Sequence, residues 1–140
     1  MGRSITLKHN ATSGVPLRST PGKTTTILWR YDKDTKYIIE ELGIEKNVDF
    51  SGNPGGFNLL NTPDELYEQL GPDGFWEKYN KPFLDAAISR GDEILMATPI
   101  NEDTLYNKLG NLNGYGREYY YLVEHGYQHV DGRMIFKGVN

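Results

Sequence analysis

Apolar side chains in this chain gather into two short runs bounded by residues that break regular structure. Residues 24–29 read TTTILW, and residues 93–98 read EILMAT, with Pro99 directly after the second run. Short runs of β-branched and aliphatic residues between breakers are typical of buried strands. We therefore expect two strands in the interior of the fold.

Helical spacing of apolar residues dominates the longer segments between and after these runs. The pattern predicts helices over residues 32–42, 62–71, 75–90 and 115–125. Thr62 and Glu65 form a capping box before the second helix, and Gly71 marks its end. Pro82 should kink or divide the third helix. In the fourth helix we expect inward-facing side chains at Tyr119, Leu122 and Val123.

Turn-forming residues shape the rest of the chain. Asp131 and Gly132 join residues 127–130 to residues 133–136, which predicts a β-hairpin with the commonest two-residue turn. Residues 45–61 and 101–116 are rich in glycine, proline and asparagine, and we expect irregular loops there.

The succession of these elements predicts one α+β domain with a small mixed or antiparallel sheet and helices. Residues 1–21 carry few large apolar residues and are interpreted as a linker or trimmed N-terminal segment, so the domain spans residues 22–140. If the two buried strands are parallel, their carboxyl ends meet at one edge, where open α/β sheets bind ligands. Arg30, Tyr31 and Thr98 would then face a common cleft.

Composition removes several kinds of chemistry. The 140 residues include no cysteine, which excludes thiol nucleophiles, disulfides and cysteine-based zinc sites. The three histidines have no metal-ligand spacing, and we expect no metal and no resident cofactor. A net charge of −4 argues against a stable nucleic-acid partner. No apolar run approaches the length of about 18 residues expected of a membrane-spanning helix.

A Gly-Lys-Thr triplet at residues 22–24 looks like the close of a phosphate-binding P-loop. The motif needs an earlier glycine where this chain has Leu17, and it needs a helix where this chain continues as a strand. We therefore reject a P-loop.

The remaining candidates for a functional site are two carboxylates, an arginine and an aromatic ring. Each of them also has a purely structural explanation. Asp92 fits turn chemistry after a helix, and Glu118 fits an acid that complements a helix dipole. Arg30 could pair with an acid in the residues that follow it. Trp76 fits a core position.

Four segments together resemble the C-terminal toxin domains of bacterial polymorphic toxins, and in particular type VI-secreted NAD(P)+ glycohydrolase toxins. They read TTILWRYDKDTKYIIEELG, FNLLNTPDELY, FWEKYNKPFLDAAISRGDEILMATP and GREYYYLVEHGY. The resemblance covers residues 24–127 and is most specific over residues 80–99. Trp29 departs from the pattern of these toxins, which have glycine before the basic residue.

The resemblance implies an ADP-ribosyltransferase-like fold and hydrolysis of the nicotinamide N-glycosidic bond of NAD(P)+. It implies a secreted or cell-surface-delivered effector of contact-dependent growth inhibition, active in the cytoplasm of the target bacterium and neutralised by a cognate immunity protein. The catalytic residues would be Asp92, Glu118 and Arg30. The substrate-binding residues would be Tyr31, Trp76, Asn80 and Thr98.

Two alternatives remain open on sequence grounds. One is a metal-independent tRNase toxin domain using Lys23, Thr26, Arg30 and tyrosines. The other is a non-catalytic binding module whose interface is the tyrosine-rich helix at residues 115–125.

Overall fold

A computed structural model describes residues 6–10, 16–29, 51–60, 62 and 64–138. The helix expected over residues 32–42, together with Arg30 and Tyr31, lies outside the described residues.

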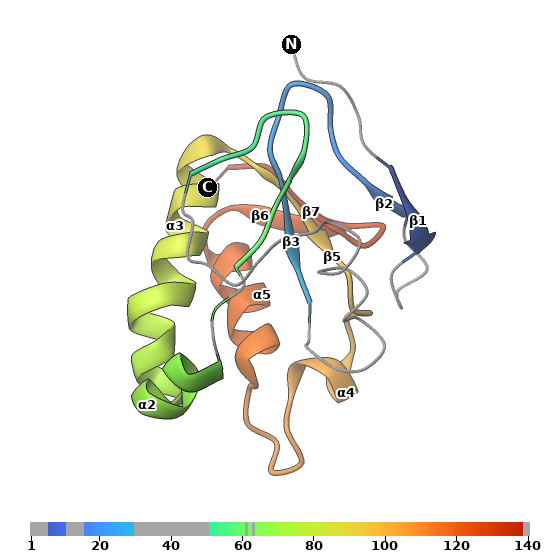
Figure 1. Cartoon of the computed structure of the whole chain (residues 1–140). Coiled ribbons are helices and arrows are strands. Elements are labelled where there is room, and N and C mark those ends of the chain that lie inside the picture. The colour runs from blue at the N-terminus through green and yellow to red at the C-terminus, as the bar shows by residue number, and fades with distance from the viewer. Residues whose placement is uncertain (1–5, 11–15, 30–50, 61, 63, 139–140) are drawn as a thin grey trace.

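A five-stranded mixed sheet forms the centre of the fold (Figure 1), with the strand order β4-β3-β5-β7-β6. Its strands are β3 (Thr25–Leu28), β4 (Phe57–Asn58), β5 (Glu93–Met96), β6 (Tyr127–Val130) and β7 (Arg133–Phe136). β3 pairs in parallel with both β4 and β5, whereas β7 pairs antiparallel with β5 and β6. The protein is therefore a small mixed α/β domain, and the parallel pairing assumed for the two buried strands is confirmed.

The two central strands are buried on both faces. Ile94 and Met96 of β5 pack into the core cluster formed with the helices. Ile27 of β3 and Leu95 of β5 point to the opposite face of the sheet and are also completely buried. This is why both strands are continuous apolar runs in the sequence rather than alternating patterns.

Helices α2 (Asp64–Phe75) and α3 (Lys81–Arg90) are joined by the π-helical turn η1 (Trp76–Asn80). They run alongside α5 (Gly114–Glu124) (Figure 1), and the short α4 (Glu102–Leu105) packs against α5. Apolar residues of α3 and α5 pack together in the core cluster with the sheet, namely Phe83, Leu84, Ala87 and Leu122.

Breaks in the helices fall where glycine and proline predict them. Gly71 has φ 71° and ψ 173°, so it ends the helical path before Pro72 starts the next turn. The chain then widens into the π turn, in which the Lys81 N–H donates to the Trp76 carbonyl five residues earlier, directly before Pro82. The hairpin is also confirmed, with Asp131 at φ 50° and Gly132 at φ 79° in its turn.

The fold contains strands and a helix that the sequence did not indicate. β4 lies in the first expected loop and α4 in the second, because backbone pairing and a capping box stabilise segments too short to show periodicity. Residues predicted as a linker contain β1 (Thr6–Asn10) and β2 (Pro16–Arg18), which form their own two-stranded sheet.

One predicted orientation in α5 is wrong. Leu122 is buried as expected, but Val123 is 42% exposed. The buried face of α5 follows Tyr115 and Leu122 instead, because the helix is aimed at the sheet by contacts that its own periodicity does not specify.

Candidate functional site

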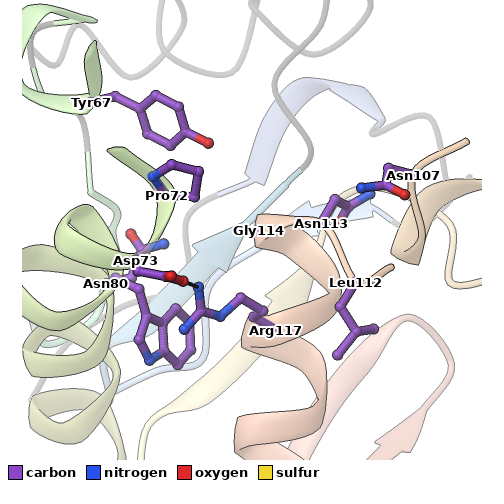
Figure 2. Close-up of a pocket in the computed structure, with 10 residues that line it drawn as sticks. Tyr67, Pro72, Asp73, Asn80, Asn107, Leu112, Asn113, Gly114 and Arg117 are labelled. Atoms are coloured by element: carbon purple, nitrogen blue, oxygen red, sulfur yellow. Dashed lines mark hydrogen bonds and ion pairs between the residues drawn. The ribbon is translucent and has the colours of Figure 1, made fainter. Parts of the chain in front are cut away.

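A pocket of about 310 Å³ lies between the α2–η1 segment and the start of α5. Figure 2 shows Tyr67, Pro72, Asp73 and Asn80 on the α2–η1 side, and Asn107, Leu112, Asn113 and Gly114 on the other side. Trp76 and Arg117 complete the lining. The lining includes two of the predicted substrate-binding residues, Trp76 and Asn80.

Arg117 reaches across the pocket from α5 toward α2 (Figure 2). Its guanidinium lies 4.6 Å from the centroid of the Trp76 ring and forms an ion pair of 2.9 Å with the Asp73 carboxylate. A guanidinium over an indole face is held by a cation–π attraction, so Arg117 is oriented by two partners.

The indole ring of Trp76 is covered by Arg117 and offers little open surface to a ligand. Trp76 is only 7% exposed, and its ring meets Tyr121 edge to face with centroids 5.5 Å apart. The predicted role of Trp76 as a stacking group for the substrate would therefore require Arg117 to move. The arrangement favours a different reading, in which Trp76 positions the guanidinium.

The first turn of α5 is fixed beside the pocket by Asn113. The Asn113 side chain accepts a hydrogen bond of 2.8 Å from the Gly116 N–H and donates one of 2.8 Å to the Thr104 carbonyl. It thereby caps α5 and joins it to α4. The positive end of the α5 dipole consequently points toward the pocket wall formed by Gly114.

Glu118 lies one position beyond Arg117, on the face of α5 shared with Tyr115 and Leu122. Its side chain is half-buried, and burial raises the pKa of its carboxyl to about 8. It makes no hydrogen bond with the part of the chain that the structure describes. A carboxyl group left without donors in a desolvated position is held in its neutral form near pH 7.

Thr98 is joined to α5 by a hydrogen bond with Tyr115. Thr98 follows the carboxyl end of β5, and its carbonyl accepts a hydrogen bond of 2.6 Å from the Tyr115 hydroxyl. Burial and the neighbouring Glu118 raise the pKa of Tyr115. Thr98, Tyr115 and Glu118 therefore form a second group at the carboxyl edge of the parallel strands.

Asp92 lies at the opposite edge of the sheet, because it precedes β5 whereas Thr98 follows it. Its side chain is 3% exposed and accepts hydrogen bonds from the Arg90 guanidinium and from the Thr26 hydroxyl, the latter at 3.0 Å. The structure thus does not bring Asp92 together with Glu118, Trp76 or Asn80. Its contacts are those of a buried structural carboxylate.

The sequence reasoning missed Arg117 and Asp73. A usable signal was present, because the first turn of α5 carries no acid but does carry Arg117, and a cation near the start of a helix opposes the dipole. Such a placement indicates that the cation has another partner. Asp73, in the turn sequence Gly-Pro-Asp-Gly, gave no comparable signal.

Comparisons with known proteins do not assign the chain to a family. No protein-family model, curated protein or solved structure matches the chain. Within the described ranges, no group of three or more histidine, aspartate or glutamate side chains could hold a metal ion. Helices in the same ranges are all too short or too polar to cross a lipid bilayer.

Proposed function

We propose that this domain hydrolyses the nicotinamide N-glycosidic bond of NAD(P)+ and serves as an interbacterial toxin, the activity that the sequence resemblance implies. The observation that carries the proposal is the pocket in which Trp76 holds Arg117 beside Asn80, with the Glu118 carboxyl next along α5. A cation suited to a phosphate and a polar amide line this pocket, and the carboxyl group follows on the same helix outside the lining, which supports the proposal.

The reaction requires little more than this set. The bond between ribose C1′ and the pyridinium nitrogen breaks, its electron pair stays on nitrogen, and nicotinamide leaves as a neutral molecule. The ribose develops an oxocarbenium-like positive charge, and a water molecule then bonds to C1′ and releases a proton. A carboxylate near C1′ stabilises the developing charge, and a guanidinium can hold a substrate phosphate through two hydrogen bonds.

Glu118 is the better candidate for the carboxylate. Asp92 is already bonded to Arg90 and Thr26 at the other edge of the sheet, whereas Glu118 has no bonded partner among the described residues. The raised pKa of Glu118 belongs to the protein without substrate. Bound NAD(P)+ brings a positively charged pyridinium ring, which favours the ionised carboxylate.

The size of the pocket restricts which part of the substrate it takes. Small-molecule sites span about 300–1,000 Å³, and this pocket of about 310 Å³ is at the small end. We assign it to one portion of the dinucleotide, with a phosphate at Arg117. Arg30, Tyr31 and Thr98 are proposed to contact the rest from the carboxyl ends of β3 and β5, in an ADP-ribosyltransferase-like architecture.

The biological setting is proposed with the activity. Delivery from a secreted or surface-displayed effector would bring the domain into the cytoplasm of a competing bacterium. Loss of NAD(P)+ would stop growth there, and an immunity protein would protect the producing cell.

Nicotinamide release from NAD+ and NADP+ by the purified chain tests the proposal directly. Glu118→Gln should lower kcat by about 100-fold or more, because it removes the charge that stabilises the transition state. Glu124→Gln is the matched control, since Glu124 is an exposed acid on the same helix. Arg117→Gln should mainly raise KM, and Arg133→Gln, which breaks the Glu93 ion pair on β5 and β7, should not.

Two outcomes would contradict the proposal. The first is the absence of nicotinamide release from either dinucleotide, with cleavage of tRNA instead, which would support the ribonuclease alternative. The second is equal turnover by the Glu118→Gln and Glu124→Gln variants, which would remove Glu118 from the reaction.

A further inference from the structure

The ion pair in the pocket joins two side chains in very different surroundings. Asp73 is 95% exposed, whereas Arg117 is 31% exposed and lies against the buried Trp76 ring. Arg117 therefore keeps a fixed place through the indole, while Asp73 covers it from the solvent side.

We infer that the Asp73 carboxylate occupies the place of a phosphate group of the ligand, so that Asp73 is an intramolecular competitor that the phosphate displaces. The identification of that phosphate as one belonging to the dinucleotide rests on the proposed function. The competition itself depends only on the positions of Asp73, Trp76 and Arg117.

Displacement of Asp73 costs little. Exposed ion pairs contribute about 0.2–1 kcal/mol, because water and salt screen them and both side chains lose freedom. The stacking of Arg117 on Trp76 does not involve Asp73 and survives its departure. A pyrophosphate group carries more negative charge than one carboxylate, and each of its phosphates offers a matching pair of oxygens to the guanidinium.

Other groups around the pocket suit an anion with several oxygens. The Asn80 side chain makes no hydrogen bond with any described residue, so its amide is available to a ligand. The side-chain oxygen Oδ1 of Asn107 accepts hydrogen bonds from the Leu109 and Asn111 N–H groups. The Asn107 NH2 group has no acceptor among the described residues and is a second available donor, and the nearby start of α5 at Gly114 adds a favourable dipole.

Asp73 consequently weakens anion binding at Arg117, because an anion must first displace the Asp73 carboxylate. Asp73→Asn removes the competing charge, leaves the shape of the side chain nearly unchanged, and should tighten anion binding. Loss of an exposed ion pair corresponds to a gain of about two- to fivefold in affinity.

Titration of the full chain with inorganic pyrophosphate, followed by calorimetry at pH 7 and low salt, measures this effect. We expect Asp73→Asn to bind pyrophosphate about two- to fivefold more tightly. Asp73→Glu should bind like the unmodified protein. Glu68→Gln is the matched control, because it removes one negative charge from an exposed position on the same helix.

The double variant Asp73→Asn with Arg117→Gln decides whether the effect acts through Arg117. Arg117→Gln should weaken pyrophosphate binding at least tenfold, and Asp73→Asn should add no gain in that background. An equal gain from Glu68→Gln, or a gain from Asp73→Asn that persists without Arg117, would overturn the inference.

The same measurements separate this inference from the proposed function. A pyrophosphate gain on Asp73→Asn without any hydrolysis of NAD(P)+ would refute the glycohydrolase and keep the competing carboxylate. Hydrolysis that depends on Glu118, without any effect of Asp73 on pyrophosphate, would do the reverse.

Discussion

Asp92 and Glu118 are both carboxylates near the core, but their partners separate their roles. Asp92 receives hydrogen bonds from Arg90 and Thr26, and its backbone carbonyl accepts another from the Tyr127 hydroxyl at 2.8 Å. The Glu118 carboxyl is desolvated by burial and makes no hydrogen bond with any described residue. A buried acid with all its partners supports the fold, whereas one without them is available for a ligand.

Removal of the Asp92 charge should therefore damage stability rather than chemistry. Asp92→Asn removes the buried charge that accepts hydrogen bonds from the Arg90 guanidinium and the Thr26 hydroxyl, and we expect a loss of about 2–3 kcal/mol in the free energy of unfolding. Urea denaturation measures it, with the exposed Asp73→Asn as control at under about 0.5 kcal/mol. Turnover per folded molecule should be unchanged. A stable Asp92→Asn protein that had lost its activity would restore Asp92 as a catalytic residue.

The raised pKa of Glu118 predicts a pH-dependent stability. In the folded protein Glu118 stays neutral up to a pKa of about 8, while in the unfolded chain it ionises near its ordinary value of 4.5. Unfolding therefore releases a proton between these values, and this group destabilises the fold progressively as pH rises through that interval.

Glu118→Gln removes this linkage. The variant should gain stability over the unmodified protein as pH increases, from almost none at pH 4.5 to about 1–2 kcal/mol at pH 8, a figure reduced for the partial exposure of the side chain. Urea denaturation at several pH values measures the difference. A constant difference across this range would show that Glu118 is not held neutral in the fold.

At the scale of elements, α5 and η1 determine where the pocket lies. The π turn inserts an extra residue before Pro82, so that Trp76 points into the core while Asn80 lines the pocket. α5 approaches α4 so closely that a Cβ on Gly116 would lie 2.2 Å from the Leu105 carbonyl oxygen. The position of Arg117 therefore depends on a glycine one residue earlier.

Two glycines of α5 give a matched test of this packing. Gly116→Ala should destabilise the protein by about 2 kcal/mol despite the better helix propensity of alanine, because backbone atoms must shift. Gly114→Ala should be neutral or stabilising by up to about 1 kcal/mol, since nothing lies within 4 Å of a Cβ there. Thermal unfolding of both variants measures the contrast. Equal effects would mean that α5 and α4 are less tightly packed than described.

For the whole molecule, the connection between the N-terminal segment and the sheet sets the boundary of the domain. The buried Ser19 hydroxyl donates to the Gly55 carbonyl at 3.0 Å, and the Thr20 hydroxyl donates to Glu93 at 2.8 Å. β1 and β2 pair with each other in a separate sheet. We therefore expect the stable unit of the domain to begin at Ser19 rather than at Gly22.

Truncation distinguishes these two boundaries. A chain beginning at Ser19 should unfold within about 1 kcal/mol of the full chain, whereas one beginning at Gly22 should lose about 1–3 kcal/mol because buried acceptors lose their donors. Urea denaturation of both truncated chains gives the comparison. Equal stability of the two would support a linker over residues 1–21.

Local rules predicted a large part of the fold. The apolar runs located β3 and β5, the Asp131-Gly132 turn located the hairpin, and Gly71 marked a break in α2. β4 escaped prediction because a two-residue strand has no periodicity of its own and exists through its pairing with β3.

The sequence by itself determined β3, β5, the hairpin and most of the course of α2, α3 and α5, because these elements depend on neighbouring residues. Residue type also supplied Trp76 and Glu118 as candidates, and the family resemblance added Asn80. Only the tertiary structure decided that Arg117 lies over Trp76, and that Asp92 lies at the far edge of the sheet. Such distances depend on how distant elements pack, and no local pattern encodes that packing.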